Sequence, residues 1–249
     1  MELGCIVQAR LGSSRLPGKV LMEIDGKNSI LYYVIKQLQQ CTLLNEIIIA
    51  TSILKEDDKI AEFVKKMGIP CFRGNSHDVL DRYYQCAKKF NLANIVRITA
   101  DCPLIDPTLV DQVIEEFFSN HCDYATNSLP KTFPQGTETE IFSFKALERS
   151  WKNAKKPSER EHVTPYIKNN KIFKKVIIKS SKDLSDFRWT VDRIEDLIFV
   201  REVVSKIKKR PILMNDILEV LSKEPELIEI NKNHVKDEGY LKSLKEDPI

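Results

Sequence analysis

Four short apolar runs, each followed by an amphipathic segment, constrain the fold of this 249-residue chain more than any other feature. The runs are LGCIVQA (3–9), EIIIAT (46–51), IPCF (69–72) and NIVRIT (94–99). Between them, apolar residues recur every three or four positions, which is the spacing of helices, over 30–40, 57–66 and 77–90. Continuous apolar strands are typical of a parallel sheet with both faces covered. The first half therefore predicts a doubly wound, mostly parallel α/β sheet.

The second half of the chain has a less regular pattern. Asp106 before Pro107 predicts a helix through about Ser119, and the two prolines and one glycine of LPKTFPQG (129–136) predict a loop. Further strands are expected at 123–127, 137–142, 173–179 and 188–191, and further helices from Phe144 and over 159–169, 194–208 and 215–222. Ser158 and Glu161 have the spacing of a capping box that would open the helix at 159–169. We expect one domain over 1–249, with 129–180 as an elaboration for the second substrate or for dimerisation and 223–249 as a loosely packed charged tail.

Composition excludes several classes of protein. The chain has 39 Lys and Arg against 36 Asp and Glu, a net charge of +3, whereas a nucleic-acid-binding protein usually carries a larger basic excess. A hydrophobic content of 42% argues against disorder, and no apolar run reaches the length of a membrane span. The six cysteines form no C-x-x-C pair, and the first residues do not form a signal peptide. These features predict a cytoplasmic protein with reduced thiols and neither nucleic-acid nor membrane partners.

The segment QARLGSSRLPGKVL (8–21), directly after the first strand, is the strongest candidate for a binding site. It combines three cations with two glycines and two hydroxyls: Arg10, Arg15, Lys19, Gly12, Gly18, Ser13 and Ser14. Cations offset the charge of a polyphosphate, while amides and hydroxyls donate hydrogen bonds to it. The alternative is a solvated basic surface loop. It is not a P-loop, because five residues rather than four separate Gly12 from Gly18 and Val20 replaces the Ser or Thr, and no G-x-G-x-x-G follows.

Asp101 is the second candidate, because it directly follows the fourth predicted strand. The carboxyl ends of parallel strands share one edge of the sheet, so Asp101 is expected beside the loop at 8–21. A carboxylate there suits Mg²⁺ that protein and phosphate oxygens bind together. The alternative is a simple turn at Asp101-Cys102-Pro103.

These residues resemble a known family. ARLGSSRLPGK resembles the signature of the sugar-activating cytidylyltransferases, which include the CMP-KDO and CMP-acylneuraminate synthetases. The chain as a whole is similar to cytidylyltransferases of the spore coat polysaccharide biosynthesis protein F type, through DVLDRYY (78–84), RITADCPLIDP (97–107), SEREHVTPYIK (158–168), FRWTVDRIEDL (187–197) and DEGYLKSL (237–244). The resemblance implies a Rossmann-like fold of the nucleotide-diphospho-sugar transferase type and a homodimer. It also implies Mg²⁺-dependent transfer of CMP from CTP to an acidic acceptor, with release of pyrophosphate. The product would be used in surface polysaccharide synthesis.

The resemblance also implies roles for individual residues. Arg15, Lys19 and Asp101 would be catalytic, and the nucleotide would contact Gln8, Ala9, Arg10, Leu11, Gly12, Ser13 and Ser14, together with Arg73, Gly74 and Arg82. Arg82 could instead be an ordinary residue of the helix surface. The acceptor would contact Gln135, Gly136, Glu138, Glu140 and Arg160, although the family tends to have Asp at the position of Glu138.

Asp192 would be the second metal ligand beside Asp101, but with Glu195 it also has the spacing of a helix cap. Two other functions are compatible with a nucleotide loop of this kind. One is a glycosyltransferase that consumes a nucleotide-sugar, and the other is a nucleotide-binding module without catalysis. No residue type in the sequence excludes UTP as the nucleotide.

Overall fold

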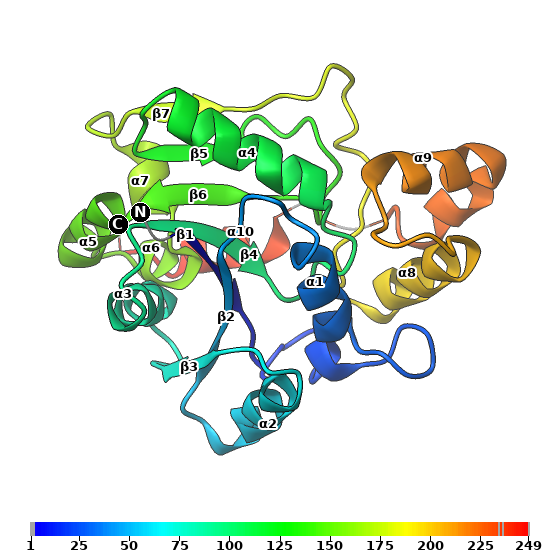
Figure 1. Cartoon of the computed structure of the whole chain (residues 1–249), viewed down its shortest axis with the longest axis horizontal. Coiled ribbons are helices and arrows are strands. Elements are labelled where there is room, and N and C mark those ends of the chain that lie inside the picture. Colours follow the sequence, from blue (N-terminus) through cyan, green and yellow to red (C-terminus); the bar gives the residue numbers. More distant parts are fainter. Residues whose placement is uncertain (1–2, 234, 236, 249) are drawn as a thin grey trace.

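The computed structural model describes residues 3–233, 235 and 237–248. In this part of the chain, seven strands form one sheet in the order β3-β2-β1-β4-β6-β5-β7 (Figure 1). The strands are β1 (Leu3–Gln8), β2 (Glu46–Ser52), β3 (Cys71–Gly74), β4 (Asn94–Thr99), β5 (Tyr124–Thr126), β6 (Glu140–Ser143) and β7 (Lys175–Ile177). Strands β1 to β4 are mutually parallel, and only β6 runs antiparallel to its neighbours β4 and β5. The predicted mostly parallel α/β fold is confirmed.

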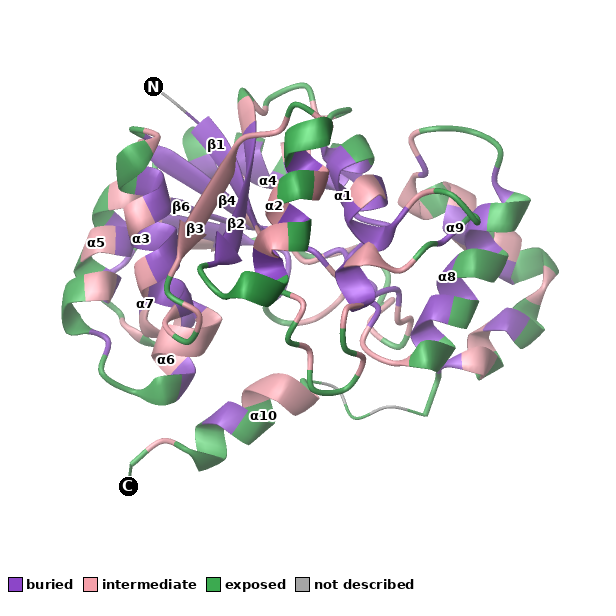
Figure 2. Cartoon of the chain, turned by 90° about the horizontal axis from the view of Figure 1, so that it is seen from below, coloured by how far each residue is buried: buried purple, intermediate pink, exposed green. Residues whose placement is uncertain are grey.

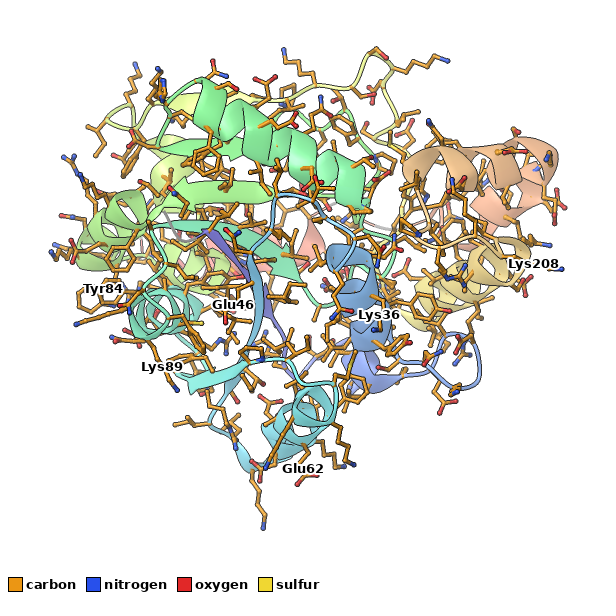
Figure 3. The ribbon with its side chains drawn as sticks, viewed as in Figure 1. Lys36, Glu46, Glu62, Tyr84, Lys89 and Lys208 are labelled. Carbon is orange, nitrogen blue, oxygen red and sulfur yellow. The ribbon has the colours of Figure 1, made fainter. Side chains whose placement is uncertain are left out.

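Helices cover both faces of the sheet because successive side chains of each strand point to opposite sides. In β1, Cys5 and Val7 pack into one hydrophobic cluster and Ile6 packs into another. The first cluster lies under α1 (Ile30–Leu38), α2 (Asp58–Lys66) and α4 (Pro107–Ser119), and the second under α3 (Val79–Lys89), α5 (Phe144–Asn153) and α7 (Pro165–Asn169). The outer faces of these helices are polar, as Lys36 on α1 and Lys89 on α3 show (Figure 3).

A third hydrophobic cluster extends the sheet domain beyond α1. It contains Ile30 and Tyr33 of α1, the fully buried Trp189, and apolar residues of α8 (Ile194–Lys206), α9 (Met214–Lys223) and the 3₁₀ segment η3 (Pro225–Ile230). These helices lie to one side of the sheet (Figure 1). The cluster fixes the segment before α8, which carries part of the site described below. Among the described residues, every helix is too short or too polar to span a bilayer.

The predicted helix over 159–169 is wrong, because the chain forms two short helices there. These are α6 (Pro157–His162) and α7, and Val163 between them has a φ of 70°. Pro165 has no amide hydrogen with which to continue a helix from α6, so the chain turns and restarts. The break directs the end of α6 toward the carboxyl ends of the strands.

The capping box predicted at Ser158 is also wrong. Lys156 precedes the first residue of α6, and the carboxylate of Glu159 accepts hydrogen bonds from the amides of Lys155 and Lys156. Ser158 lies within the helix, where its amide and hydroxyl donate to Asp247 at 2.9 and 2.7 Å. Glu161, the predicted partner of Ser158 in the capping box, is therefore available for other contacts.

The segment 188–191 is extended but is not the predicted strand. It forms one isolated bridge, between Arg188 and Gln135, and the amide of Val191 donates to the carbonyl of Asp101 at 2.8 Å. The segment thus leaves the sheet and passes beside the end of β4. This path brings two distant parts of the sequence together at one edge of the sheet.

The charged tail is more ordered than the sequence predicted. Leu227 of η3 is buried in the third cluster, and a final helix, α10 (Glu238–Lys245), lies against α6. Residues 234, 236 and 249 of this segment lie outside the described residues. The single-domain boundary and the dimerisation role of 129–180 stay predictions, although β6 and β7 of that range join the central sheet.

Gly136 provides a test of the close approach between its loop and the segment before α8. Its φ is 104°, and a Cβ atom there would lie 2.5 Å from the backbone nitrogen of Thr190. Gly26 has a φ of 77° with no atom within 4 Å of the corresponding position. We expect Gly26→Ala to lose about 1 kcal/mol of unfolding free energy from backbone strain alone, and Gly136→Ala to lose at least about 2 kcal/mol more from overlap. Urea unfolding of both variants measures the difference, and equal losses would contradict the close packing.

Candidate active site

A cavity of about 750 Å³ opens at the carboxyl ends of β1 and β4. After β1 the chain builds β2 and β3 on one side, and it then returns to the other side of β1 to form β4. Open α/β sheets bind ligands at such a reversal of strand order. The lining side chains come from the loop after β1, from α3, α6 and α10, and from the segment before α8.

Most of the predicted nucleotide and catalytic residues meet in this cavity. Those that line it are Gln8, Ala9, Arg10, Gly12, Ser13, Ser14, Arg15, Lys19, Arg82, Asp101, Arg160 and Asp192. Residues 8, 101 and 192 are far apart in the sequence, so the fold and not local spacing brings them together. Seven predicted residues do not line the cavity, namely Leu11, Arg73, Gly74, Gln135, Gly136, Glu138 and Glu140.

Leu11 anchors the loop after β1 and does not face the cavity. Its amide donates to the buried carboxylate of Asp57 at 2.8 Å, and its carbonyl accepts from the amides of Ser13 and Gly18 at 2.7 and 2.9 Å. Gly18 has a φ of 74°, a conformation that favours glycine, and it starts a short 3₁₀ turn. The turn directs the next residue, Lys19, into the site.

The ammonium group of Lys19 joins the two aspartates predicted as metal ligands. Its Nζ donates to Asp101 at 2.7 Å, to Asp192 at 2.8 Å and to the carbonyl of Val191 at 2.7 Å. Burial lowers the pKa of Lys19, but the two carboxylates outweigh burial and hold this pKa above its ordinary value. Lys19 is therefore charged at neutral pH, although only 7% of the residue is exposed.

Asp192 has two further cationic partners. Arg15 lies 2.5 Å and Arg188 lies 2.8 Å from its carboxylate. Burial raises the pKa of Asp192, but Lys19 first and then Arg15 hold it well below its ordinary range. This carboxylate is thus an anion that faces the end of the loop after β1.

Asp192 is not the cap of α8, which was the alternative role. The first helical turn is preceded by Arg193, and the carboxylate of Asp196 accepts hydrogen bonds from the amides of Asp192 and Arg193 at 2.9 and 3.0 Å. Glu195 therefore has no part in a capping box with Asp192. The Asp192 side chain is directed to the cavity instead.

Three buried polar atoms around the cavity have no hydrogen-bond partner among the described residues. They are Oε1 of Gln8, Nε of Arg82 and Nε of Arg97. Arg82 is 1% exposed and donates from Nη1 to the carbonyl of Asn75. Buried polar atoms are normally satisfied, so these three atoms are exceptions, and protein atoms cover them although the cavity is open. Arg82 is therefore not an ordinary residue of the helix surface.

Arg73 and Gly74 have structural contacts in place of the predicted nucleotide contacts. Arg73 donates to the carbonyl groups of Ser52 and Leu54 and pairs with Asp58 at 2.5 Å. A Cβ atom on Gly74 would lie 3.1 Å from Cγ of Arg82, so glycine gives this arginine room to pack. Both residues support the wall of the cavity from behind.

Three predicted acceptor residues lie behind the carboxylate pair. Arg188 donates to Gln135 at 2.8 Å and to Asp192 at 2.8 Å, so Gln135 is connected to the site through one guanidinium. The amide of Gly136 donates to Glu138 at 2.6 Å, and burial raises the pKa of that carboxyl. The structure does not bring these residues into the cavity with Arg160, whose guanidinium pairs with Asp78.

Glu140 belongs to a buried polar cluster and not to the cavity lining. Its carboxylate pairs with Arg97 at 2.5 Å and Lys168 at 2.7 Å, and it accepts from Tyr124 and Thr164. Burial raises its pKa, but Lys168 and Arg97 hold the pKa well below its ordinary range. These contacts use the carboxylate fully, so its predicted contact with the acceptor is not supported.

Several residues of the cavity were missed by the sequence analysis. They are Asp78, Arg97, Thr99, Glu161, His162, Lys242 and Ser243, and His77 also lines the cavity although no role was predicted for it. Arg97 and Thr99 lie in β4, where a period-two count from Asp101 would have placed them on one face. Nothing in the sequence indicates that α10 reaches the site, because its position depends on contacts with α6.

The sheet reversal, the cationic loop after β1 and the paired carboxylates define the chain as a nucleotidyltransferase. They place cationic side chains and two carboxylates at one edge of a parallel sheet, where open α/β sheets bind ligands. The chain belongs to the cytidylyltransferase family, because the family model described as "Cytidylyltransferase" matches residues 4–238. It is a CTP-dependent nucleotidyltransferase.

Known proteins of similar sequence or structure agree with this assignment. The spore coat polysaccharide biosynthesis protein SpsF of Bacillus subtilis is 30% identical over 230 residues, which cover 89% of this chain and 94% of SpsF. A 3-deoxy-manno-octulosonate cytidylyltransferase of Trichlorobacter lovleyi is 34% identical over 122 residues, 48% of this chain and 46% of that protein. The structure of a cytidylyltransferase from Leptospira borgpetersenii superposes with a TM-score of 0.88 at 34% identity, covering 94% of this chain and 98% of that one.

The pKa of His162, which lines the cavity, predicts how the stability of the protein depends on pH. Burial lowers its pKa to about 4, Arg97, Lys168 and Arg10 act in the same direction, and Glu161 opposes them. The unfolded chain, with an ordinary value of 6.5, binds this proton first as the pH falls. The His162 contribution to stability is therefore constant above pH 6.5 and is lost progressively toward pH 4.

We expect the free energy of unfolding of the wild-type protein to fall by on the order of 2 kcal/mol between pH 7 and pH 5 because of His162. Urea unfolding at the two pH values measures the loss, and His162→Gln removes the titrating group while it keeps a polar side chain. The loss should be smaller in His162→Gln than in the wild type. An equal loss in both proteins would show that His162 is not the group responsible.

Proposed function

We propose that this enzyme catalyses Mg²⁺-dependent transfer of CMP from CTP to an acidic acceptor, with release of pyrophosphate, in the synthesis of a surface polysaccharide. One observation carries the proposal. Lys19 pairs with both Asp101 and Asp192, and Arg15 pairs with Asp192, at the reversal of strand order. A loop rich in amides and hydroxyls lies beside them. This arrangement can hold the phosphates of a nucleotide and the cation that accompanies them.

The donors present fit Mg²⁺. Asp101 and Asp192 offer hard carboxylate oxygens, and their shared contact with Lys19 Nζ shows that the two side chains approach one another. The described residues contain no group of three or more His, Cys, Asp or Glu side chains arranged to hold a metal. Mg²⁺ is commonly bound by one or two carboxylates together with substrate phosphates, so two ligands suffice. When bound, the ion would offset charge on the phosphates.

The protein side chains have complementary roles in the reaction. An acceptor oxygen attacks the α-phosphorus of CTP, the new O–P bond forms, and the bond from that phosphorus to the oxygen of the leaving pyrophosphate breaks. Lys19, Arg15 and Arg10 stabilise charge that develops on the pyrophosphate, mainly in the transition state. Gln8 lines the cavity at the end of β1, where we place the nucleoside. Positioning by these groups supplies much of the rate, because no protein nucleophile is needed.

The names of the relatives and the charge of the cavity support a proposal for the acceptor class, and the resemblance noted in the sequence supports a proposal for the assembly. The names of SpsF and of the 3-deoxy-manno-octulosonate cytidylyltransferases indicate polysaccharide synthesis and a sugar acid for those proteins. In this chain, Lys242 lines the cavity and can attract a carboxylate or phosphate, whereas Arg160, which also lines it, pairs with Asp78. We propose a sugar acid or a phosphorylated sugar or polyol as the acceptor, and a homodimer as the working form.

The nucleotide is tested by calorimetric titration with CTP, UTP, ATP and GTP, each with and without Mg²⁺. We expect CTP to bind more tightly than the other three and Mg²⁺ to strengthen its binding. A panel of acidic sugars, with 3-deoxy-manno-octulosonate as the first, is then screened for pyrophosphate release. Equal affinity for all four nucleotides, or preference for a nucleotide-sugar, would contradict the proposal.

Lys19→Ala tests the role of the ammonium group. Removing one preorganised donor from such a site costs about 10²- to 10³-fold in kcat, and pyrophosphate release measures this loss. Lys36, exposed on the outer face of α1, provides the matched Lys→Ala control (Figure 3). Circular dichroism checks the fold, and Lys19→Arg separates loss of charge from loss of structure. Full turnover by Lys19→Ala would exclude the mechanism.

Asp101→Asn tests the metal ligand with a polar side chain of the same size, and the described contacts of the Asp101 carboxylate are with Lys19 and the Cys102 thiol. We expect the variant to bind CTP without Mg²⁺ at least as well as the wild type and to lose the Mg²⁺-dependent gain. Calorimetry measures both quantities. Asp111→Asn, on the exterior at the start of α4, is the control. A retained Mg²⁺ effect in Asp101→Asn would place the metal elsewhere.

A further inference from the structure

Helix α10 covers part of the cavity but joins none of the three hydrophobic clusters formed by the described residues. Leu241 and Leu244 are 46% and 41% exposed. Figure 2 shows α10 set apart from the sheet and its covering helices, with most of its length exposed or half-buried. Burial of apolar surface is the main stabilising contribution in a folded chain. Helix α10 therefore belongs to the part of the structure that opens at low cost in free energy.

Polar contacts attach the carboxyl-terminal half of α10 to α6. The hydroxyl of Ser243 donates to Glu161 at 2.6 Å and lies 2.9 Å from Nε2 of His162. Asp247, just after the helix, accepts from the amide and hydroxyl of Ser158. These contacts hold this end against α6 in the wall of the cavity.

The amino-terminal end of α10 is attached to the nucleotide end of the cavity. Glu238 accepts from Arg193 at 3.0 Å through both carboxylate oxygens, and it lies 3.6 Å from Nη1 of Arg15. A Cβ atom on Gly239 would lie 3.8 Å from the same Nη1, so the first turn of the helix lies directly against Arg15. Asp237 pairs with Lys131 just before the helix.

Arg15 is thus shared between the helix and the site. One end of its guanidinium pairs with Asp192 at 2.5 Å and the other faces Glu238. A phosphate that binds Arg15 has to compete with a carboxylate for the same donors. A phosphate can displace Glu238, because Nη1 of Arg15 lies 3.6 Å from that carboxylate, whereas arginine and phosphate frequently form direct bidentate hydrogen bonds.

We propose that α10 is a lid over the cavity and that Glu238 is its latch, which the nucleotide weakens when its phosphates take Arg15 from Glu238 and leave Arg193 as the partner of that carboxylate. The inference rests on the proposed function in that Arg15 binds phosphate. Gly239, Lys242 and Ser243 line the cavity from α10, so movement of the helix changes the end of the cavity that faces α6. Nucleotide binding would then precede entry of the second substrate.

The test compares wild type with three variants in full-length protein. Glu238→Gln removes the latch. Asp247→Ala removes the attachment at the other end of α10 and leaves the contacts of Arg15 unchanged. Glu219→Gln is the control, because it removes an exposed carboxylate of α9 that pairs with Lys223. Hydrogen–deuterium exchange of residues 237–247 reports opening of the helix. Calorimetry with CTP and with inorganic tripolyphosphate, both in Mg²⁺, reports competition for Arg15.

We expect saturating CTP or tripolyphosphate to speed exchange in the first turn of α10 of the wild type. Without ligand, Glu238→Gln and Asp247→Ala should both exchange faster than the wild type. Only Glu238→Gln should bind the two ligands more tightly, by about fivefold, the ratio that corresponds to a surface ion pair of about 1 kcal/mol. Glu219→Gln should match the wild type in both measurements.

Unchanged or slower exchange of α10 with bound CTP would overturn the latch and leave the proposed function standing. The same conclusion follows if Glu238→Gln binds with the wild-type affinity or more weakly. If tripolyphosphate speeds exchange and CTP binds no better than tripolyphosphate, the latch stands and the cytidylyltransferase proposal fails. If neither ligand binds, both proposals fail.

Discussion

The contact of Lys19 with two carboxylates is the interaction on which the site depends. Asp101 and Asp192 come from segments 91 residues apart, and their like charges would repel one another without a cation between them. A buried charge is costly unless it is paired, and here one ammonium group compensates both anions while it satisfies a backbone carbonyl. Lys19 therefore links the loop after β1 to the end of β4 and to the approach to α8, which a hydrogen bond from the Val191 amide to the Asp101 carbonyl also joins to each other.

Charge compensation continues behind the site and links it to the third hydrophobic cluster. Arg188 joins Asp192 to the fully buried Asp196, whose carboxylate also accepts the amides at the start of α8. Trp189 and Val191 alternate with these polar residues and pack on the opposite side into the cluster. The extended segment thus separates a charged face from an apolar one, so the position of Asp192 is fixed by burial of its neighbours.

The sequence predicted those parts of the molecule that depend on local patterns. The first four strands, the loop at 8–21 and the strand-end position of Asp101 all follow from apolar periodicity and from the residues that interrupt it. The hydrogen bond from the Leu11 amide to the Asp57 carboxylate could not be predicted, because the two residues are 46 positions apart. Asp57 was instead expected at the start of a helix. The reversal of β6 depends on contacts across the loop, such as the bond from the Thr139 amide to the Asn127 side chain. Glu140 was expected at the acceptor because of the resemblance, whereas its surroundings in three dimensions make it part of a buried ion cluster.

The loop after β1 is closed at its base, because the amide of Gly18 donates to the carbonyl of Leu11 while Asp57 holds the Leu11 amide. The two ends of the loop are therefore fixed independently of the residues between them. Lengthening a loop whose ends are already joined adds little to its closure entropy, about 0.6 kcal/mol for a doubling of length. Apart from Arg15, which pairs with Asp192, the interior at 12–17 can vary in length and composition while Arg10 and Lys19, just outside the closed base, keep their positions. Diversification of phosphate recognition within such a ring would leave the catalytic cation in place.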